Sequence, residues 1–413
     1  MTLQLVSIAF NYDQTSAANS AINIRRNRDY EIPIPEFSKE TIWDFNYNCA
    51  AYAIAETLNE TVYIQVEFAT LPTTVRTYEV KATGGGIMGN LDPIQIVFEN
   101  GAATETNLIP LTHRTFSKIG AYDITWEWSY RIEGSNSWIR LQTSHHRIYL
   151  VLTIPPAPWT QDIGDYHNPW GDLLNDCCVI AAGSEDSVTT TRKIAKKVYS
   201  NYNLRYDTIQ GRGRYCLTSS GPFSIDNWID YVIRGNVPDN PRFCPGTPED
   251  YPDKWIVNCY DCAAALSFMA KILGANTGYN FHDNFGYLNY VEPIGRGKCN
   301  NPFYGCSGTP AVGPDDPRSG FGNHAYTKLN GQTYDACMKQ WLSSTQKAIL
   351  WLIILIIIIF SCGQRNIADL LDRVGGWLLN LSQNNYEEFT IDTSESFEAT
   401  VATGTPYPRI IDF

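Results

Sequence analysis

The chain has 413 residues, of which 44% are hydrophobic and 18% charged, and its formal net charge is −12. This composition excludes a disordered chain and provides enough core material for two domains and a tail. The acidic balance argues against nucleic acid, or an anionic membrane surface, as the main partner.

The N-terminal part, residues 1–156, is predicted to be all-β. Short segments rich in Val, Ile, Tyr, Thr and Trp are separated by turn residues such as those at 84–86 and 100–101. The predicted strands include residues 62–68, 76–82, 94–98, 123–131 and 147–154. Strands at this spacing indicate a sandwich of Ig-like architecture. The segment Pro155-Pro156-Ala157-Pro158 is a stiff, extended hinge, so we place a domain boundary there.

After this hinge the hydrophobic pattern changes to a helical period. Helices are predicted at residues 172–182, 185–199, 224–233 and 259–273. From Tyr287 onward the pattern again favours strands and loops, so the second domain, residues 157–345, is predicted to be α+β. Residues 346–413 contain an apolar segment, a predicted amphipathic helix at 366–381 and an acidic tail, whose role the sequence does not indicate.

The apolar segment Ala348–Phe360 is the feature that bears on a membrane. It is shorter than the ~20 apolar residues that a spanning helix needs. A short anchor, a buried element and a sequence artefact therefore all remain open. The first residues lack the basic region of a secretory signal, and we expect a cytoplasmic location only by default.

Cys259 is the candidate nucleophile. It lies where the extended segment Val257-Asn258 enters an apolar helix. The unsatisfied N–H groups and the positive dipole end of a helix N-terminus favour the thiolate form of a cysteine. The same N–H groups can hold a developing oxyanion. Cys262, one turn further on, is expected to pack inside.

A predicted β-hairpin brings together a histidine and a carboxylate. Asn330-Gly331 is typical of a two-residue type I′ turn. Continued outward from this turn, the register places His324 opposite Cys337 and makes His324 and Asp335 diagonal neighbours on one face, roughly 7 Å apart at Cα. A carboxylate that orients an imidazole is the third member of a catalytic triad.

These motifs occur in the same order in a known family. The helix after Cys259 carries small, apolar, basic and glycine residues at set spacings, namely Ala263, Ala265, Met269, Lys271 and Gly274. The segments Asn323-His324-Ala325-Tyr326 and Tyr334-Asp335 follow. In these features residues 255–337 resemble the papain-like core of the transglutaminase-like superfamily, which often follows a β-sandwich. The resemblance implies Cys259, His324 and Asp335 as the triad, with no cofactor and no metal.

The chain also departs from the pattern of that family. Tyr326 stands where the family usually has Trp, Ala336-Cys337 replaces the common Pro-Thr, and the loop before His324 is long. An aromatic side chain often completes the oxyanion hole in this superfamily. Trp228 and Trp255 are the candidates here, and the sequence does not choose between them.

Other readings of the cysteines are weaker. Cys259 and Cys262 match a C-x-x-C redox pair, but no βαβ pattern surrounds them. With Cys299 and Cys306 they offer four thiolates for zinc, although the gap of six residues between the second two exceeds the usual two to four.

Two further motifs are interpreted as structural. The glycines at 84, 86 and 89 fit a dinucleotide-binding pattern, but Asn90-Leu91-Asp92-Pro93 follows them instead of a helix, which favours a loop. His145 and His146 are neighbours on a predicted strand, so they point to opposite faces and do not form a joint metal site.

The sequence therefore predicts a cysteine-dependent acyl transfer on an amide of a protein or peptide substrate. With water as the acceptor of the acyl group, the enzyme would be a peptidase, amidase or deamidase. With an amine as the acceptor, it would be a transglutaminase. A catalytically silent binding module with the same fold is the alternative. A toxin-like effector that modifies a host or rival protein is a third possibility. The intact Cys259, His324 and Asp335 favour the enzyme, and the sequence does not choose between water and an amine.

Overall fold

The computed structural model describes residues 2–13, 21–39, 48–71, 76–99, 103–159, 164–207, 211–216, 218–219, 221–236, 255–286, 291–296, 321–340 and 407–409. The protein is mixed α/β, with several sheets. Its contacts form two compact units, Met1–Ile194 with Phe268–Asn276, and Ala195–Ser267 with Thr277–Phe413. The predicted division after residue 156 stays a prediction, as do the predictions for residues 346–406, which lie outside the described residues.

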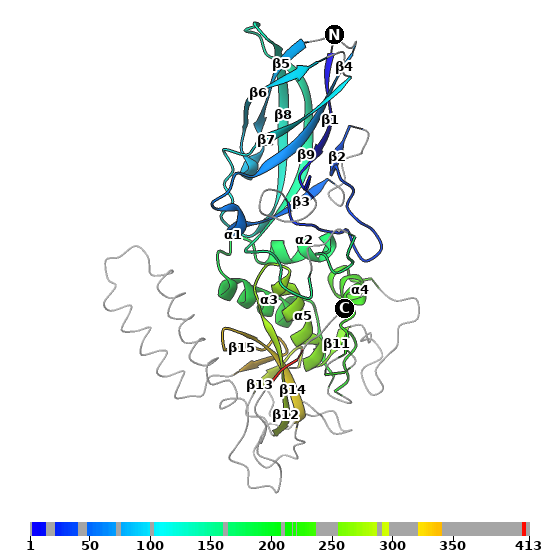
Figure 1. Ribbon diagram of the computed structural model, residues 1–413. Coiled ribbons are helices and arrows are strands. Elements are labelled where there is room, and N and C mark those ends of the chain that lie inside the picture. Colours follow the sequence, from blue (N-terminus) through cyan, green and yellow to red (C-terminus); the bar gives the residue numbers. More distant parts are fainter. Residues whose placement is uncertain are drawn as a thin grey trace, which may run out of the picture. The chain divides into compact units, whose positions relative to one another are not determined.

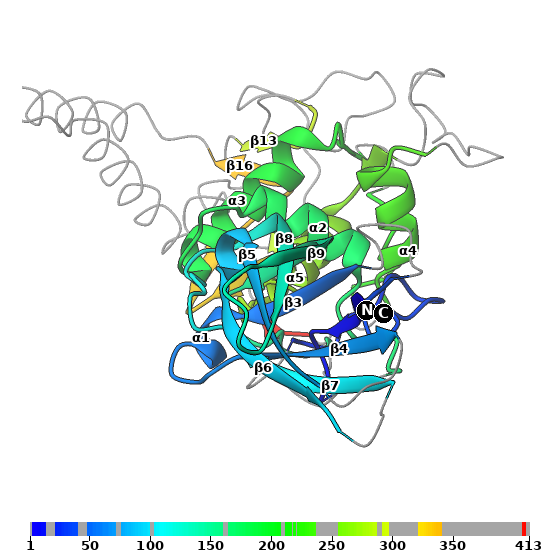
Figure 2. The same ribbon diagram turned by 90° about the horizontal axis from the view of Figure 1, so that it is seen from above.

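The first unit contains two sheets, drawn in Figures 1 and 2. One has the order β2-β1-β4-β7, with bounds β1 Thr2–Ala9, β2 Phe37–Ser38, β4 Tyr63–Leu71 and β7 Thr104–Pro110. The other has the order β3-β9-β8-β5-β6, with bounds β3 Cys49–Ala53, β5 Arg76–Gly84, β6 Leu91–Phe98, β8 Gly120–Ile132 and β9 Ile139–Val151. Neighbouring strands are antiparallel except for β3 and β9, which run parallel.

The buried faces of the two sheets share one hydrophobic core. Strand β8 shows how the sequence builds it, because Ile124, Trp126 and Trp128 alternate with exposed residues and point inward. Each fully buried aromatic side chain contributes about 2–3 kcal/mol relative to an exposed one. His145 is exposed and His146 is buried, as their adjacent positions on β9 predict.

Gly274, the last residue of the pattern that follows Cys259, is required by a close contact between two backbone segments. It follows α5 (Cys259–Lys271), and its segment, residues 268–276, belongs to the first unit. Gly274 has a φ of 86°, and a Cβ there would lie 2.5 Å from the backbone nitrogen of Thr153. The N–H of Leu152 also donates to the carbonyl of Leu273 at 3.0 Å. Only glycine therefore allows this close approach of two backbones.

The remaining elements of the first unit are a short helix and a glycine turn between strands, and helices after the proline segment. Helix α1 (Ile54–Thr57) follows β3, and α2 (Gly171–Ile180) contacts β8 and β9. The glycines at 84–89 form a loop with one 3₁₀ turn, Gly86–Met88, as predicted. Helix α3 (Ser187–Asn201) begins in the first unit and ends in the second.

The second unit contains a sheet of order β15-β14-β12-β17, shown in Figure 1. Its bounds are β12 Gly278–Gly286, β14 Phe321–Leu329, β15 Gln332–Tyr334 and β17 Tyr407–Pro408. Two short strand pairs accompany it, β10 (Arg205–Tyr206) with β11 (Ile256–Val257), and β13 (Val291–Pro293) with β16 (Met338–Gln340). The hydroxyl of Thr327 on β14 donates to the carbonyl of Ala263 at 3.0 Å, which joins the sheet to α5.

The helices predicted between residues 172 and 273 agree with the observed ones to within a few residues, whereas the helix predicted at 366–381 lies outside the described residues. The segment predicted at 224–233 is one turn of α-helix, α4 (Ile225–Asn227), continued by a π-helix over Trp228–Ile233. Strand β12 was missed, because strands were expected only from Tyr287 onward. Within the described residues, no helix combines the length and the apolarity that crossing a membrane requires. The apolar segment 348–360 lies outside them.

Candidate active site

A reciprocal cap fixes the start of the helix that carries Cys259. Strand β11 ends at Val257, and Asn258 precedes the first helical residue. The N–H of Asp261 donates to Oδ1 of Asn258 at 3.1 Å, and the N–H of Asn258 donates to Oδ2 of Asp261 at 3.2 Å. This is a capping box, which satisfies two N–H groups that the helix leaves unpaired. Cys259 is therefore held at the first helical position.

The carboxylate of Asp261 also binds a second segment of backbone. It accepts the N–H groups of Arg214 at 2.8 Å, Tyr215 at 2.8 Å and Cys216 at 2.7 Å. The side chain is fully buried, and burial raises the pKa of Asp261 to about 6, although the backbone donors lower it. Loop 214–216 and the cysteine helix are thus tied to one carboxylate.

The hairpin adopts the predicted turn and register. Asn330 and Gly331 have φ values of 52° and 80°, as a type I′ turn requires. Leu329 pairs with Gln332, and Thr327 pairs with Tyr334. The pairing ends at Tyr334, so Asp335 follows directly after β15, while His324 lies three residues before the paired part of β14.

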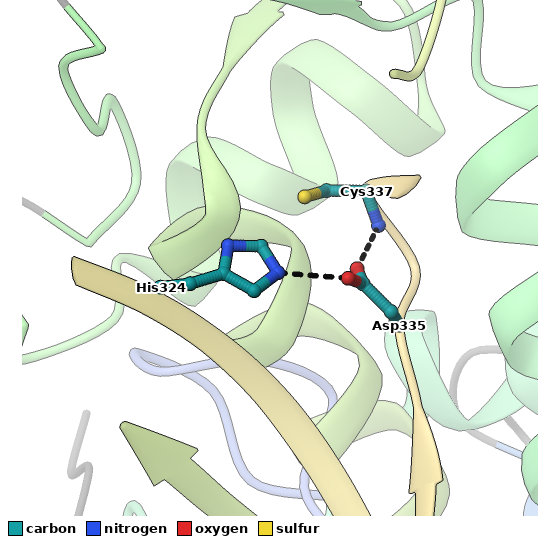
Figure 3. Close-up of side chains that lie close together, drawn as sticks. All are labelled: His324, Asp335 and Cys337. Atoms are coloured by element: carbon teal, nitrogen blue, oxygen red, sulfur yellow. Dashed lines mark hydrogen bonds and ion pairs between the residues drawn. The ribbon is translucent and has the colours of Figure 1, made fainter. Parts of the chain in front are cut away.

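His324 and Asp335 form a buried hydrogen-bonded pair (Figure 3). Nε2 of His324 lies 2.8 Å from Oδ2 of Asp335. The other carboxylate oxygen, Oδ1, accepts the N–H of Cys337 at 2.8 Å and that of Met338 at 3.1 Å. The His324 side chain is fully buried, and that of Asp335 is 4% exposed. The backbone therefore fixes the carboxylate, which in turn fixes the imidazole.

The electrostatics of His324 link the pair to Cys259. Burial lowers the pKa of His324, but the charge of Asp335, its hydrogen bond and a hydrogen-bonding interaction with Cys259 raise it to about 10. Since Nε2 bonds Asp335, Nδ1 is the nitrogen available to exchange a proton with the thiol. His324 and Asp335 thus lie together as predicted from the sequence, Cys259 contributes to the raised pKa of His324, and the imidazole favours its charged form.

Burial also governs three other thiols of this unit. Cys262 and Cys337 are buried, and burial is the main cause that raises the pKa of both thiols well above its usual range. Burial also raises the pKa of Cys216 to about 12. These three thiols therefore remain protonated near neutral pH.

The two tryptophans proposed for the oxyanion hole occupy different environments. Trp228 is buried in the π-helix, and its ring packs against those of Tyr202, Tyr215 and Phe223. Trp255 is partly buried and lies just before β11. Their roles in the oxyanion hole remain predictions.

Tyr206 is a candidate residue that sequence reasoning missed. Strand β10 pairs in parallel with β11, which places Tyr206 beside Val257, two residues before Cys259. The side chain is buried, and burial followed by the charge of Cys259 raises the pKa of Tyr206 well above its usual range. A strand of two residues has no detectable periodicity, so the parallel pairing was not visible from the sequence.

No model of a known protein family matches the chain. No curated protein matches it either. The four-thiolate zinc site of the sequence analysis involves Cys299 and Cys306, which lie outside the described residues.

Proposed function

We propose that this chain is a transglutaminase-like cysteine enzyme that transfers an acyl group from an amide of a protein or peptide substrate. The observation that supports this most is the buried hydrogen-bonded pair of His324 and Asp335, with Cys259 among the groups that raise the pKa of His324. A thiol, an imidazole and a carboxylate in this order are the parts that nucleophilic amide chemistry needs. The Ig-like character of the first unit belongs to the same proposal.

The first half-reaction forms a thioester. His324 holds the thiol proton of Cys259, and the thiolate Sγ attacks the carbonyl carbon of the amide. Backbone N–H groups at the start of α5 stabilise the oxyanion, and we assign the aromatic donor of that site to Tyr206. As the C–N bond breaks, the imidazolium gives its proton to the leaving amine.

The second half-reaction releases the acyl group. His324 takes a proton from water or from a primary amine, which attacks the thioester carbonyl, and Cys259 leaves as the thiolate, which restores the thiolate–imidazolium pair. Water gives a carboxylic acid and an amine gives a new amide. The described residues offer no feature that selects one acceptor over the other.

A catalytically silent binding module is the second candidate. The burial of the site favours it, since Cys259 is only 4% exposed and His324 fully buried. In that case the hydrogen-bonded pair would be structural, and the first unit would recruit a partner.

An assay on casein, with and without a fluorescent primary amine, tests the proposal. Peptide fragments indicate hydrolysis, incorporation of the amine indicates transamidation, and ammonia without fragments indicates deamidation. Each product must disappear in Cys259→Ala. If no product forms, and a thiol-reactive peptide probe labels the wild type and Cys259→Ala equally, the chain is a silent module.

A further inference from the structure

A third side chain joins the buried pair of the site. His324, Asp335 and Cys337 each offer one ligand atom, a ring nitrogen, a carboxylate oxygen and Sγ, and these atoms all lie within 4.8 Å of one another. Figure 3 shows the three side chains facing one another. Cys337 lies three residues beyond the end of β15 and one residue before β16.

We propose that these three residues form a zinc site that switches the triad off. Zinc is bound in proteins by imidazole, carboxylate and thiolate, in tetrahedral geometry. Ligand atoms around a tetrahedral zinc ion lie roughly 3.3–3.6 Å apart, given bond lengths of about 2.0–2.3 Å. Nε2 of His324 and Oδ2 of Asp335, 2.8 Å apart, would need to separate by about 0.5 Å, and Sγ of Cys337 would need to approach by about 1.5 Å at most. A thiolate ligand excludes Mg²⁺ and Ca²⁺, which prefer oxygen.

The backbone already supports the carboxylate ligand. Oδ1 of Asp335 accepts the N–H groups of Cys337 and Met338, so Oδ2 keeps its direction when its partner changes. The ion takes the place of the proton between Nε2 of His324 and Oδ2. That proton and the thiol proton of Cys337 pass to water, and the thiolate and carboxylate balance the charge of Zn²⁺.

Zinc in this position separates His324 from its orienting carboxylate. The imidazole then cannot serve as base for Cys259, so the ion inhibits acyl transfer. The inhibition rests on the proposed function, but the binding does not. Binding is therefore the primary readout.

The test is a titration of the full-length protein, freed of metal with a chelator, with Co²⁺ as a spectroscopic probe and then with Zn²⁺. Co²⁺ bound to a thiolate gives a charge-transfer band in the near ultraviolet, which Zn²⁺ should abolish. We expect Cys337→Ser and His324→Ala to lose the band. Cys262→Ala, a matched buried cysteine, and Cys259→Ala should keep it.

A band that survives in Cys337→Ser, or one that disappears in Cys259→Ala, overturns the proposal, as does a wild type that gives no band. Asp335→Asn provides a second variant if Cys337→Ser does not fold, and its affinity for Zn²⁺ should fall at least tenfold. In an active enzyme, the concentration of Zn²⁺ that halves activity should rise at least tenfold in Cys337→Ser. If the same concentration of Zn²⁺ halves the activity of the wild type and of Cys337→Ser, the proposed inhibition is wrong.

Discussion

Asn258 and Asp261 cap the same helix reciprocally, each donating its backbone N–H to the side chain of the other. Asp261 also accepts three N–H groups from loop 214–216, so one carboxylate serves two segments. Cys259, the proposed nucleophile, lies between the two capping residues in the sequence. Its position therefore depends on a polar network with no part in the reaction.

The first prediction tests this network. Asp261→Ala leaves buried N–H groups without an acceptor, and each costs about 1–3 kcal/mol, so we expect a loss of at least 3 kcal/mol of unfolding free energy. Asn258→Ala removes one cap and should cost about 1 kcal/mol. Thermal unfolding followed by circular dichroism compares the two variants. Equal unfolding temperatures in the two variants would contradict the role of Asp261 in holding both the helix start and loop 214–216.

The elements that the sequence predicted well are those with a strong local signal. The alternation around Trp126 and Trp128 marks β8, and the Asn330-Gly331 pair fixes the register of the hairpin. The helical spacing of apolar residues after Cys259 predicts α5. In each case a few neighbouring residues determine the outcome.

The elements that were missed depend on contacts between distant segments. Strand β10 has two residues and gains its pairing only from β11, about fifty positions away. Strand β12 contains Asn280, His282 and Asp283, which disfavour a strand locally, but β14 pairs with it along most of its length. Tyr206 therefore could not be placed near Cys259 before the fold was known.

The second prediction separates the two cysteines of α5. Cys259→Ala should abolish acyl transfer, because it removes the nucleophile. Cys262→Ala should keep at least a tenth of the activity, since its buried thiol stays protonated. Product formation from casein measures both. An inactive but folded Cys262→Ala, together with an active Cys259→Ala, would reverse the assignment.

The third prediction concerns the hairpin turn. Asn330 and Gly331 both have positive φ, which costs other residues about 1–2 kcal/mol each. Replacing the pair with Ala-Ala should shift the register and reduce kcat far more than a surface change would, because a shift of one residue moves His324 to the other face. Gly-Gly keeps the positive φ and is the matched control. Wild-type kinetics in a folded Ala-Ala variant would show that this turn does not set the triad.

The fourth prediction tests the assignment of Tyr206. Removing one donor to an oxyanion costs about 10²–10³ in kcat. Tyr206→Phe should therefore lower kcat at least tenfold with little change in KM. Tyr199→Phe is the control, because its hydroxyl donates to the carbonyl of Glu292 at 3.0 Å and has no part in the proposed reaction. If both variants keep full activity, Tyr206 is not the donor.

The last prediction concerns Asp335, measured in buffer with a metal chelator. Asp335→Asn should reduce kcat by roughly 10–10³, less than the ~10⁴ of a serine triad, because a thiol is already partly ionised near neutral pH. His324→Ala should lose more. The asparagine keeps the shape of the side chain but allows the wrong imidazole tautomer.

The pH dependence distinguishes the orienting role of Asp335 from a structural one. The pKa of His324 is raised from 6.5 to about 10, with Asp335 as the principal cause that raises it. A raised pKa in the folded state adds stability that is fully present below pH 6.5 and is lost as pH rises through about 10. Wild-type stability should thus fall over this window, and Asp335→Asn should flatten the decline, whereas the exposed Asp283→Asn should not.

The alkaline limb of the rate profile should move in parallel. It reports the loss of the imidazolium proton, so it should lie at higher pH in the wild type and shift to lower pH in Asp335→Asn. If Asp335→Asn leaves the rate, the profile and the stability slope unchanged while His324→Ala is inactive, another residue orients the imidazole. Asp315 and Asp316, which precede His324 in the sequence and lie outside the described residues, are then the next carboxylates to replace.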